Sequence, residues 1–160
     1  MIVVVLDMDE TLGVYHNNVF HTRPKVDFMI KMLRAMDIEI ILWSLGEDDY
    51  VRRVVNGFLP SIYSFAYKIF ARSEAKISMK LYGFYKASER IREMYDEPIF
   101  LIGVDDKVSN NMDPAYDIRI HVPPYNKPEN KDRCLLDVCE KIVEDVSLIK
   151  DLTPSKCSFW

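Results

Sequence analysis

Residues 2–12 read IVVVLDMDETL, and this stretch is the strongest indication of how the chain folds. The run from Ile2 to Leu6 is aliphatic throughout, which predicts a strand buried on both faces, as at the centre of a parallel sheet. Asp7 and Asp9 follow this run at once. Because α/β folds bind ligands at the carboxyl ends of parallel strands, we expect these carboxylates to lie in a crevice at the edge of the sheet.

Strand and helix patterns alternate along the rest of the chain. Further strands are expected over residues 38–43, 65–71, 99–104 and, as an alternating edge strand, 118–122. This alternation predicts the α/β class, with a single doubly wound, Rossmann-like parallel sheet that carries helices on both faces.

Helical periodicity fills most of the connections between these strands. Helices are expected from Pro24 to about Met36, over residues 49–58 and 84–95, and along an amphipathic stretch after Pro128. Residues 12–22 and 72–83 show neither period, and we expect them to be irregular.

The composition is that of an ordinary globular domain. The 160 residues are 49% hydrophobic and 29% charged, which suits one domain with a sizeable core. We place this domain over residues 1–152 and expect a mobile tail over 153–160. The net charge of −4 argues against nucleic acid or an anionic membrane as the main partner.

The cellular setting is inferred from what the chain lacks. No apolar run reaches the roughly 20 residues of a membrane helix, and the first strand has no features of a signal peptide. The cysteines, Cys134, Cys139 and Cys157, are odd in number and unclustered, which is typical of reduced thiols. We therefore expect a cytoplasmic or nuclear protein.

Chemically active residues gather where the expected strands end. The group consists of Asp7, Asp9, Ser44, Lys86, Asp105 and Asp106. Each one alone could be a helix cap or a solvated loop charge. Adjacent acids after a buried strand repel each other unless a cation compensates them, and carboxylates are ligands that hard cations prefer. Together the group predicts one site that binds a divalent cation.

The same residues carry a resemblance to a known family. Residues 7–12, DMDETL, match the DxDxT-L signature of the haloacid dehalogenase (HAD) superfamily of aspartyl phosphatases. The chain is most similar to the small phosphatases of the RNA polymerase II C-terminal-domain type. Further segments that resemble theirs are Arg23-Pro24, Leu42–Leu45, Phe70–Arg72, Tyr85-Lys86 and Val104–Asp106, which follow the order of the family's motifs.

The resemblance implies a Mg²⁺-dependent phosphomonoesterase that forms an aspartyl-phosphate. It assigns Asp7 as the nucleophile and Asp9 as the general acid and then the general base. It assigns Mg²⁺ to Asp7, the backbone carbonyl of Asp9, and the Asp105-Asp106 pair, and it leaves open which member of that pair touches the metal.

The resemblance also implies a set of groups that contact the substrate. Ser44 and Lys86 are expected to hold the phosphoryl oxygens. Lys80 is the rival for the lysine, and the position of Lys86 before the strand over 99–104 favours Lys86. Arg72 and Thr11 are further candidates for substrate contact, Thr11 mainly by orienting its loop.

The substrate is the least constrained of these expectations. Residues 13–22 are much shorter than the corresponding segment of those phosphatases, which carries a small β-insert used in substrate recognition, so we expect a minimal cap or none. An open site favours a phosphoprotein, on Ser/Thr or Tyr, or another large substrate.

Three alternatives stay open from the sequence. The first is a small-molecule or polynucleotide phosphatase of the same superfamily. The second is an inactive relative that binds phosphoproteins, although neither the nucleophile nor the acid is missing. The third is a receiver-like domain that accepts a phosphoryl group, although no acid follows residues 65–71, where a receiver has its acceptor.

Overall fold

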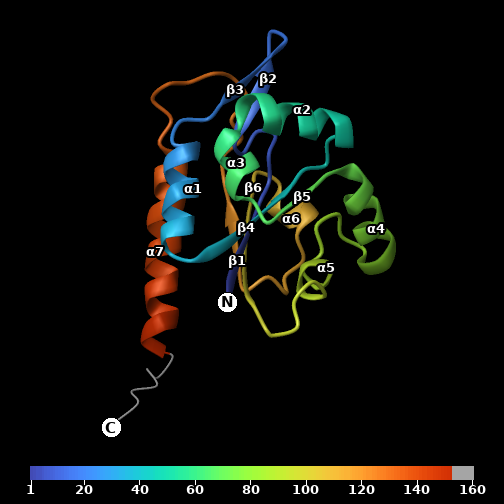
Figure 1. Ribbon diagram of the computed structural model, residues 1–160, viewed down its shortest axis with the longest axis vertical. Coiled ribbons are helices and arrows are strands. Elements are labelled where there is room, and N and C mark those ends of the chain that lie inside the picture. Colours follow the sequence, from blue (N-terminus) through green and yellow to red (C-terminus); the bar gives the residue numbers. More distant parts are fainter. Residues whose placement is uncertain (153–160) are drawn as a thin grey trace.

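The computed structural model describes residues 1–152, and its centre is a five-stranded parallel sheet (Figure 1). The strands follow the order β5-β4-β1-β6-β7. Their bounds are β1 (Ile2–Leu6), β4 (Ile38–Trp43), β5 (Lys68–Phe70), β6 (Phe100–Asp105) and β7 (Ile118–His121). The first strand therefore pairs with β4 on one side and β6 on the other, both parallel. The predicted doubly wound α/β sheet is confirmed, and β7 is an edge strand as expected.

Helices cover both faces of the sheet (Figure 1). One face packs against α1 (Val26–Ala35), α2 (Asp48–Phe58), α3 (Pro60–Phe65) and α7 (Cys134–Leu152). The other face packs against α5 (Ser88–Arg92) and α6 (Val108–Asn111), and α4 (Arg72–Tyr82) lies beside α5. Successive residues of a strand point to opposite faces. Val4 and Leu6 accordingly enter the larger core and Val3 and Val5 the smaller one, which explains why β1 is apolar throughout.

Residues 12–22 form a hairpin, so the prediction that they are irregular was wrong. The strands β2 (Gly13–His16) and β3 (Val19–Thr22) pair antiparallel beyond the main sheet. Their turn, Asn17-Asn18, has φ angles of 51° and 62°, which asparagine tolerates better than most residues. Only the hairpin's start and Phe20 are buried, so no apolar alternation marks it in the sequence. As a cap over the sheet edge it is minimal.

Three further element bounds differ from the sequence expectation. Residues 72–82 form the helix α4, where a loop was expected. Its buried side consists of the small residues Ala75 and Ser78, so the sequence shows little apolar period there. The helix expected over 84–95 is only Ser88–Arg92, because residues 83–86 form a bend and a turn, and the Phe84 carbonyl accepts from the Ser78 hydroxyl of α4. The strand expected over 65–71 shortens to Lys68–Phe70 because α3 runs to Phe65.

Two expectations concern the ends of the domain and its setting. Within residues 1–152, no helix is long and apolar enough to cross a membrane. The tail expected over residues 153–160 lies outside the described residues.

Candidate active site

Three acidic side chains meet at the carboxyl ends of β1 and β6. Asp7 follows β1, Asp105 is the last residue of β6, and Asp106 comes next. One carboxylate oxygen from each lies within 4.8 Å of the others, a grouping that could hold a metal ion. The parallel pairing of Leu6 with Val104 produces this meeting, because it brings the ends of the two strands level.

Lys86 is the cation of this cluster and is fully buried. Its Nζ lies 2.7 Å from Asp7 Oδ1 and 2.6 Å from Asp105 Oδ2. Burial acts to lower the pKa of Lys86, but the charges of the two carboxylates outweigh it, so the pKa is raised and the ammonium persists. Lys80, its rival in the sequence, is exposed on α4.

Asn111 was missed by the sequence reasoning. Its side-chain nitrogen donates to both oxygens of Asp105, at 3.3 and 3.1 Å, and its backbone carbonyl accepts the Lys86 backbone N–H at 2.8 Å. With the Lys107 backbone N–H on Oδ1 and the Lys86 ammonium on Oδ2, both oxygens of Asp105 are occupied. The only signal in the sequence was a polar residue a short distance after the acidic pair.

Asp106 is partly exposed to solvent, whereas Asp105 is fully buried. It helps to line a pocket of about 120 Å³ at the strand ends, together with Asp7, Asp9, Glu10, Leu45, Gly46, Lys107 and Asn111. Burial, a hydrogen bond with Asp7, and the nearby acidic charges raise the pKa of Asp106 to about 8. At neutral pH this carboxyl therefore tends to keep its proton, and a bound cation would lower its pKa and ionise it.

Asp9 also lines this pocket, where it contacts residues of α2 and of the loop after β4. Its Oδ1 accepts from the Tyr50 hydroxyl at 2.7 Å and its Oδ2 from the Ser44 hydroxyl at 3.4 Å. Burial raises the pKa of Asp9, the Tyr50 hydrogen bond opposes the shift, and the charge of Asp7 adds to it. The contact of Tyr50 with Asp9 depends on the packing of α2.

Thr11 forms hydrogen bonds with both Asp7 and Asp106. Its buried hydroxyl donates to Asp7 Oδ2 at 2.7 Å and accepts the Asp106 backbone N–H at 3.2 Å. These contacts fix the free side of the Asp7 carboxylate, so Thr11 orients the site from behind.

Arg72 lies apart from the acidic cluster. Its Nε donates to the Leu45 carbonyl at 3.0 Å and its Nη1 pairs with Glu47 at 3.3 Å. The Arg72 backbone N–H also donates to Gly46, so the residue holds the loop that follows Ser44. The structure thus brings the other predicted site residues to one sheet edge and places Arg72 against the rim of that edge.

The family model of the NLI interacting factor-like phosphatases matches residues 2–153. The chain belongs to this family. The expectation of a phosphatase of the HAD and C-terminal-domain type is confirmed by this match, whereas a comparison with curated proteins found none that matches.

Solved structures share the fold at low sequence identity. A variant of the fission yeast RNA polymerase II CTD phosphatase Fcp1, bound to beryllium fluoride, has a TM-score of 0.53 and 12% identity over 92% of this chain and 51% of that chain. An uncharacterized protein from Listeria monocytogenes serotype 4b has a TM-score of 0.51 and 15% identity over 95% and 100% of the two chains. This chain therefore spans about half the length of the Fcp1 structure, and the likeness concerns the fold alone.

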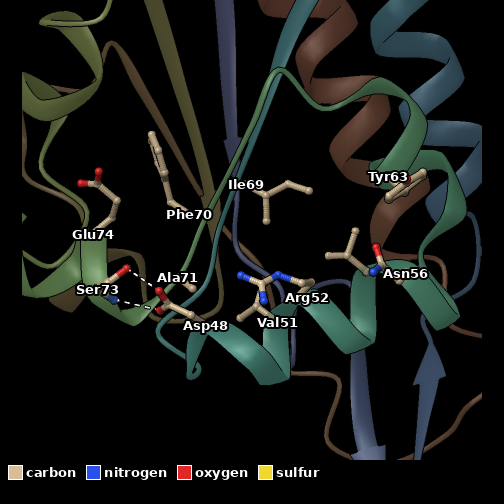
Figure 2. A pocket seen from close by; sticks show the side chains of 11 residues that line it. Asp48, Val51, Arg52, Asn56, Tyr63, Ile69, Phe70, Ala71, Ser73 and Glu74 are labelled. Atoms are coloured by element: carbon tan, nitrogen blue, oxygen red, sulfur yellow. Dashed lines mark hydrogen bonds between the residues drawn. The ribbon is translucent and has the colours of Figure 1, made fainter.

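Two pockets that are larger than the one at the strand ends flank α2 in this NLI interacting factor-like phosphatase. One, of about 340 Å³, lies between α2, α3, β5 and the start of α4 (Figure 2). There Asp48 accepts hydrogen bonds from the backbone and hydroxyl of Ser73, and none of the predicted catalytic residues lines the pocket. The other, of about 370 Å³, is lined by Tyr15, Asn18, Tyr50, Arg53, Val54 and Phe58. Because Tyr50 also contacts Asp9, this second pocket adjoins the catalytic group.

Proposed function

We propose that this phosphatase hydrolyses phosphomonoesters through a covalent phosphate on Asp7. The observation that carries the proposal is the setting of Asp7, whose carboxylate is held by the buried Lys86 ammonium on one oxygen and by Thr11 on the other. A carboxylate needs no deprotonation at neutral pH, and fixed orientation offsets its weak nucleophilicity. The Lys86 charge also compensates the approach of an anionic phosphoryl group.

Asp9 performs the two proton transfers in this proposal. As an Asp7 oxygen bonds to phosphorus, the ester oxygen leaves and takes the Asp9 proton. Water then attacks the phosphorus, Asp9 accepts the proton, and the bond from phosphorus to Asp7 breaks to release inorganic phosphate. The raised pKa of Asp9 favours the first step, because a larger fraction of the carboxyl carries the proton it must give.

The donor set fits a magnesium ion. All candidate ligands are oxygens, and the clustered carboxyls that raise the pKa of Asp106 need a positive charge to ionise together. We assign the metal to Asp7, Asp106 and the backbone carbonyl of Asp9. Asp105 instead holds Lys86 and Asn111, because it is fully buried and does not line the small pocket, whereas Asp7 and Asp106 do. The bound ion supplies charge neutralisation for the phosphoryl oxygens.

In this proposal the phosphoryl group binds against the loop that follows β4, which begins at Ser44. We assign its oxygens to Lys86, the Ser44 hydroxyl, and the Leu45-Gly46 backbone, which lines the small pocket. Arg72 acts on substrate through that loop, because its guanidinium is engaged with Leu45 and Glu47.

A phosphoprotein segment is the substrate that the surroundings support best. The pocket of about 120 Å³ suits a phosphoryl group and little more. The neighbouring pocket offers Tyr15, Phe58 and the exposed Arg53, which makes no ion pair with any residue from 1 to 152. Aromatic walls and a cation suit a peptide with an apolar and an acidic residue next to the phosphorylated one.

The test of the chemistry is turnover of p-nitrophenyl phosphate by wild type, Asp7→Asn and Asp49→Asn. Asp49 is an exposed acid on α2 and serves as the matched control. We expect turnover that needs Mg²⁺, is abolished by EDTA, and falls by about 10⁴-fold in Asp7→Asn alone. Full activity of Asp7→Asn, or activity that ignores EDTA, contradicts the proposal. Stable labelling by acetyl phosphate without repeated turnover would indicate the receiver-like alternative.

The test of the substrate class compares a phosphopeptide panel with sugar phosphates, nucleotides and 3′-phosphorylated nucleic acid. In the phosphoprotein case Arg53→Glu raises KM for acidic phosphopeptides and leaves p-nitrophenyl phosphate unaffected. Arg52→Glu is the control, because Arg52 lines the pocket of Figure 2 instead. Higher kcat/KM on sugar phosphates or nucleotides, with no effect of Arg53→Glu, supports the small-molecule alternative.

A further inference from the structure

Arg23 is a buried charge that the proposed chemistry does not use. It lies between β3 and α1, and its side chain is 1% exposed. Nε and Nη2 donate to the two carboxylate oxygens of Asp132 at 2.9 and 3.0 Å. The guanidinium carbon also lies 5.3 Å from the centre of the Tyr125 ring. Both partners belong to the segment between β7 and α7, which arches over the carboxyl edge of the sheet (Figure 1).

The third nitrogen of Arg23 reaches the turn behind the catalytic residues. Nη1 donates to the Thr11 carbonyl at 3.3 Å and to the Glu10 carbonyl at 3.5 Å. The Tyr125 backbone N–H donates to the same Glu10 carbonyl at 2.7 Å. Glu10 has a φ of 63°, a left-handed conformation that persists in a residue with a side chain when its surroundings hold it.

The same turn carries the groups that orient the nucleophile. Thr11 presents its carbonyl to Arg23 and its hydroxyl to Asp7 and the Asp106 backbone. A shift of the turn would therefore displace the Thr11 hydroxyl from Asp7, and with it the Asp9 carbonyl that precedes Glu10. Small misplacements of a reacting group have large effects on rate.

We propose that Arg23, held by Asp132, is a positioning residue for this site. The pair sets the backbone of residues 9–11 and so aims the Asp7 carboxylate and the Asp9 carbonyl. The predicted effect on rate rests on the proposed phosphatase chemistry. The effect on the turn and on cation affinity does not.

The variant that isolates this role is Arg23→Lys. Lysine keeps the charge but cannot form the fork that holds two carboxylate oxygens and two carbonyls together. Arg92→Lys is the matched control, because Arg92 donates to the carbonyls of Ile99 and Ala115 and pairs with Asp117 at the opposite edge of the sheet. Both changes remove similar hydrogen bonds, but only one of them adjoins the turn.

Three readouts separate positioning from a purely structural role. For Arg23→Lys we expect kcat to fall at least tenfold with little change in KM, the Kd for Mg²⁺ measured by calorimetry to rise several-fold, and backbone amides of residues 9–12 to exchange hydrogen faster. Arg92→Lys lowers the melting temperature and leaves all three unchanged. Asp132→Asn, a near-isosteric change, reproduces the Arg23→Lys effects, and the double variant is no worse than either single one.

The outcomes that overturn the proposal are equally specific. If Arg23→Lys matches Arg92→Lys, with lower stability but wild-type kcat, Mg²⁺ affinity and amide exchange, then Arg23 is structural only. If Arg23→Lys does not fold, Asp132→Asn decides the question by the same readouts. A wild-type protein without phosphatase activity refutes the proposed function, while Mg²⁺ affinity and amide exchange still decide the role of Arg23.

Discussion

Replacement of Tyr50 by phenylalanine should shift the pH dependence of catalysis upward. The Tyr50 hydroxyl donates to Asp9 at 2.7 Å, which stabilises the ionised carboxylate and lowers its pKa relative to what burial alone would produce. Loss of the donor therefore raises the pKa of Asp9. A hydrogen bond to a charged group contributes about 1.5–3 kcal/mol, and one pKa unit corresponds to 1.36 kcal/mol. Since both side chains are partly exposed, we expect a shift of about one unit.

The assay is the pH profile of kcat/KM on a phosphoserine peptide. Its alkoxide leaving group needs the Asp9 proton, so the alkaline limb should move to higher pH by about one unit in Tyr50→Phe. With p-nitrophenyl phosphate the shift should shrink, because its leaving group is stable without a proton.

Tyr15→Phe is the control for this experiment, since Tyr15 packs edge-on against the Tyr50 ring and has no bond to Asp9. An unchanged profile on the phosphoserine peptide, or a shift to lower pH, would refute Asp9 as the general acid.

Three further predictions concern the acidic cluster and the hairpin. Lys86→Met leaves Asp7 and Asp105 without their buried cation, so unfolding free energy should fall by about 3–5 kcal/mol, with activity reduced at least 10²-fold, as measured by denaturant titration and kinetics. Without metal, the melting temperature should fall as the pH rises from 3.8 to about 8, because folding raises the pKa of Asp106. Asp106→Asn should flatten this pH dependence and abolish the stabilisation by Mg²⁺. Gly13→Ala should lower the melting temperature, since the new Cβ would lie 2.5 Å from the His21 carbonyl oxygen and cost about 1–3 kcal/mol.

The sequence was most informative where a function is local to a strand end. Asp7 and Asp105 could be placed together because apolar strands carried them and parallel strands end at one edge. Lys86 could be favoured by its position along the chain, although its hydrogen bonds could not be foreseen. They depend on Asn111 and Tyr116, which hold its backbone N–H and carbonyl from a different part of the chain.

Contacts between distant segments were the part that the sequence did not reveal. The contacts of Tyr50 with Asp9 and of Asn111 with Asp105 depend on how α2 and α6 pack. The hairpin over residues 13–22 was missed for a related reason. Its strands are short and mostly exposed, so its structure comes from the turn and from a close backbone approach at Gly13.

The central place of β1 in the sheet has a consequence for the order of folding. This strand precedes both of its neighbours, β4 and β6, and β6 lies far further along the chain. Pairing of Leu6 with Val104 closes a long loop, and such non-local contacts form slowly. An apolar strand that is not yet paired with its neighbouring strands is prone to association with other chains. Chaperone dependence during synthesis should therefore be greatest before residue 105 leaves the ribosome. The nucleophile is thus made well before Asp105 and Asp106, and its site assembles only when β6 has paired with β1.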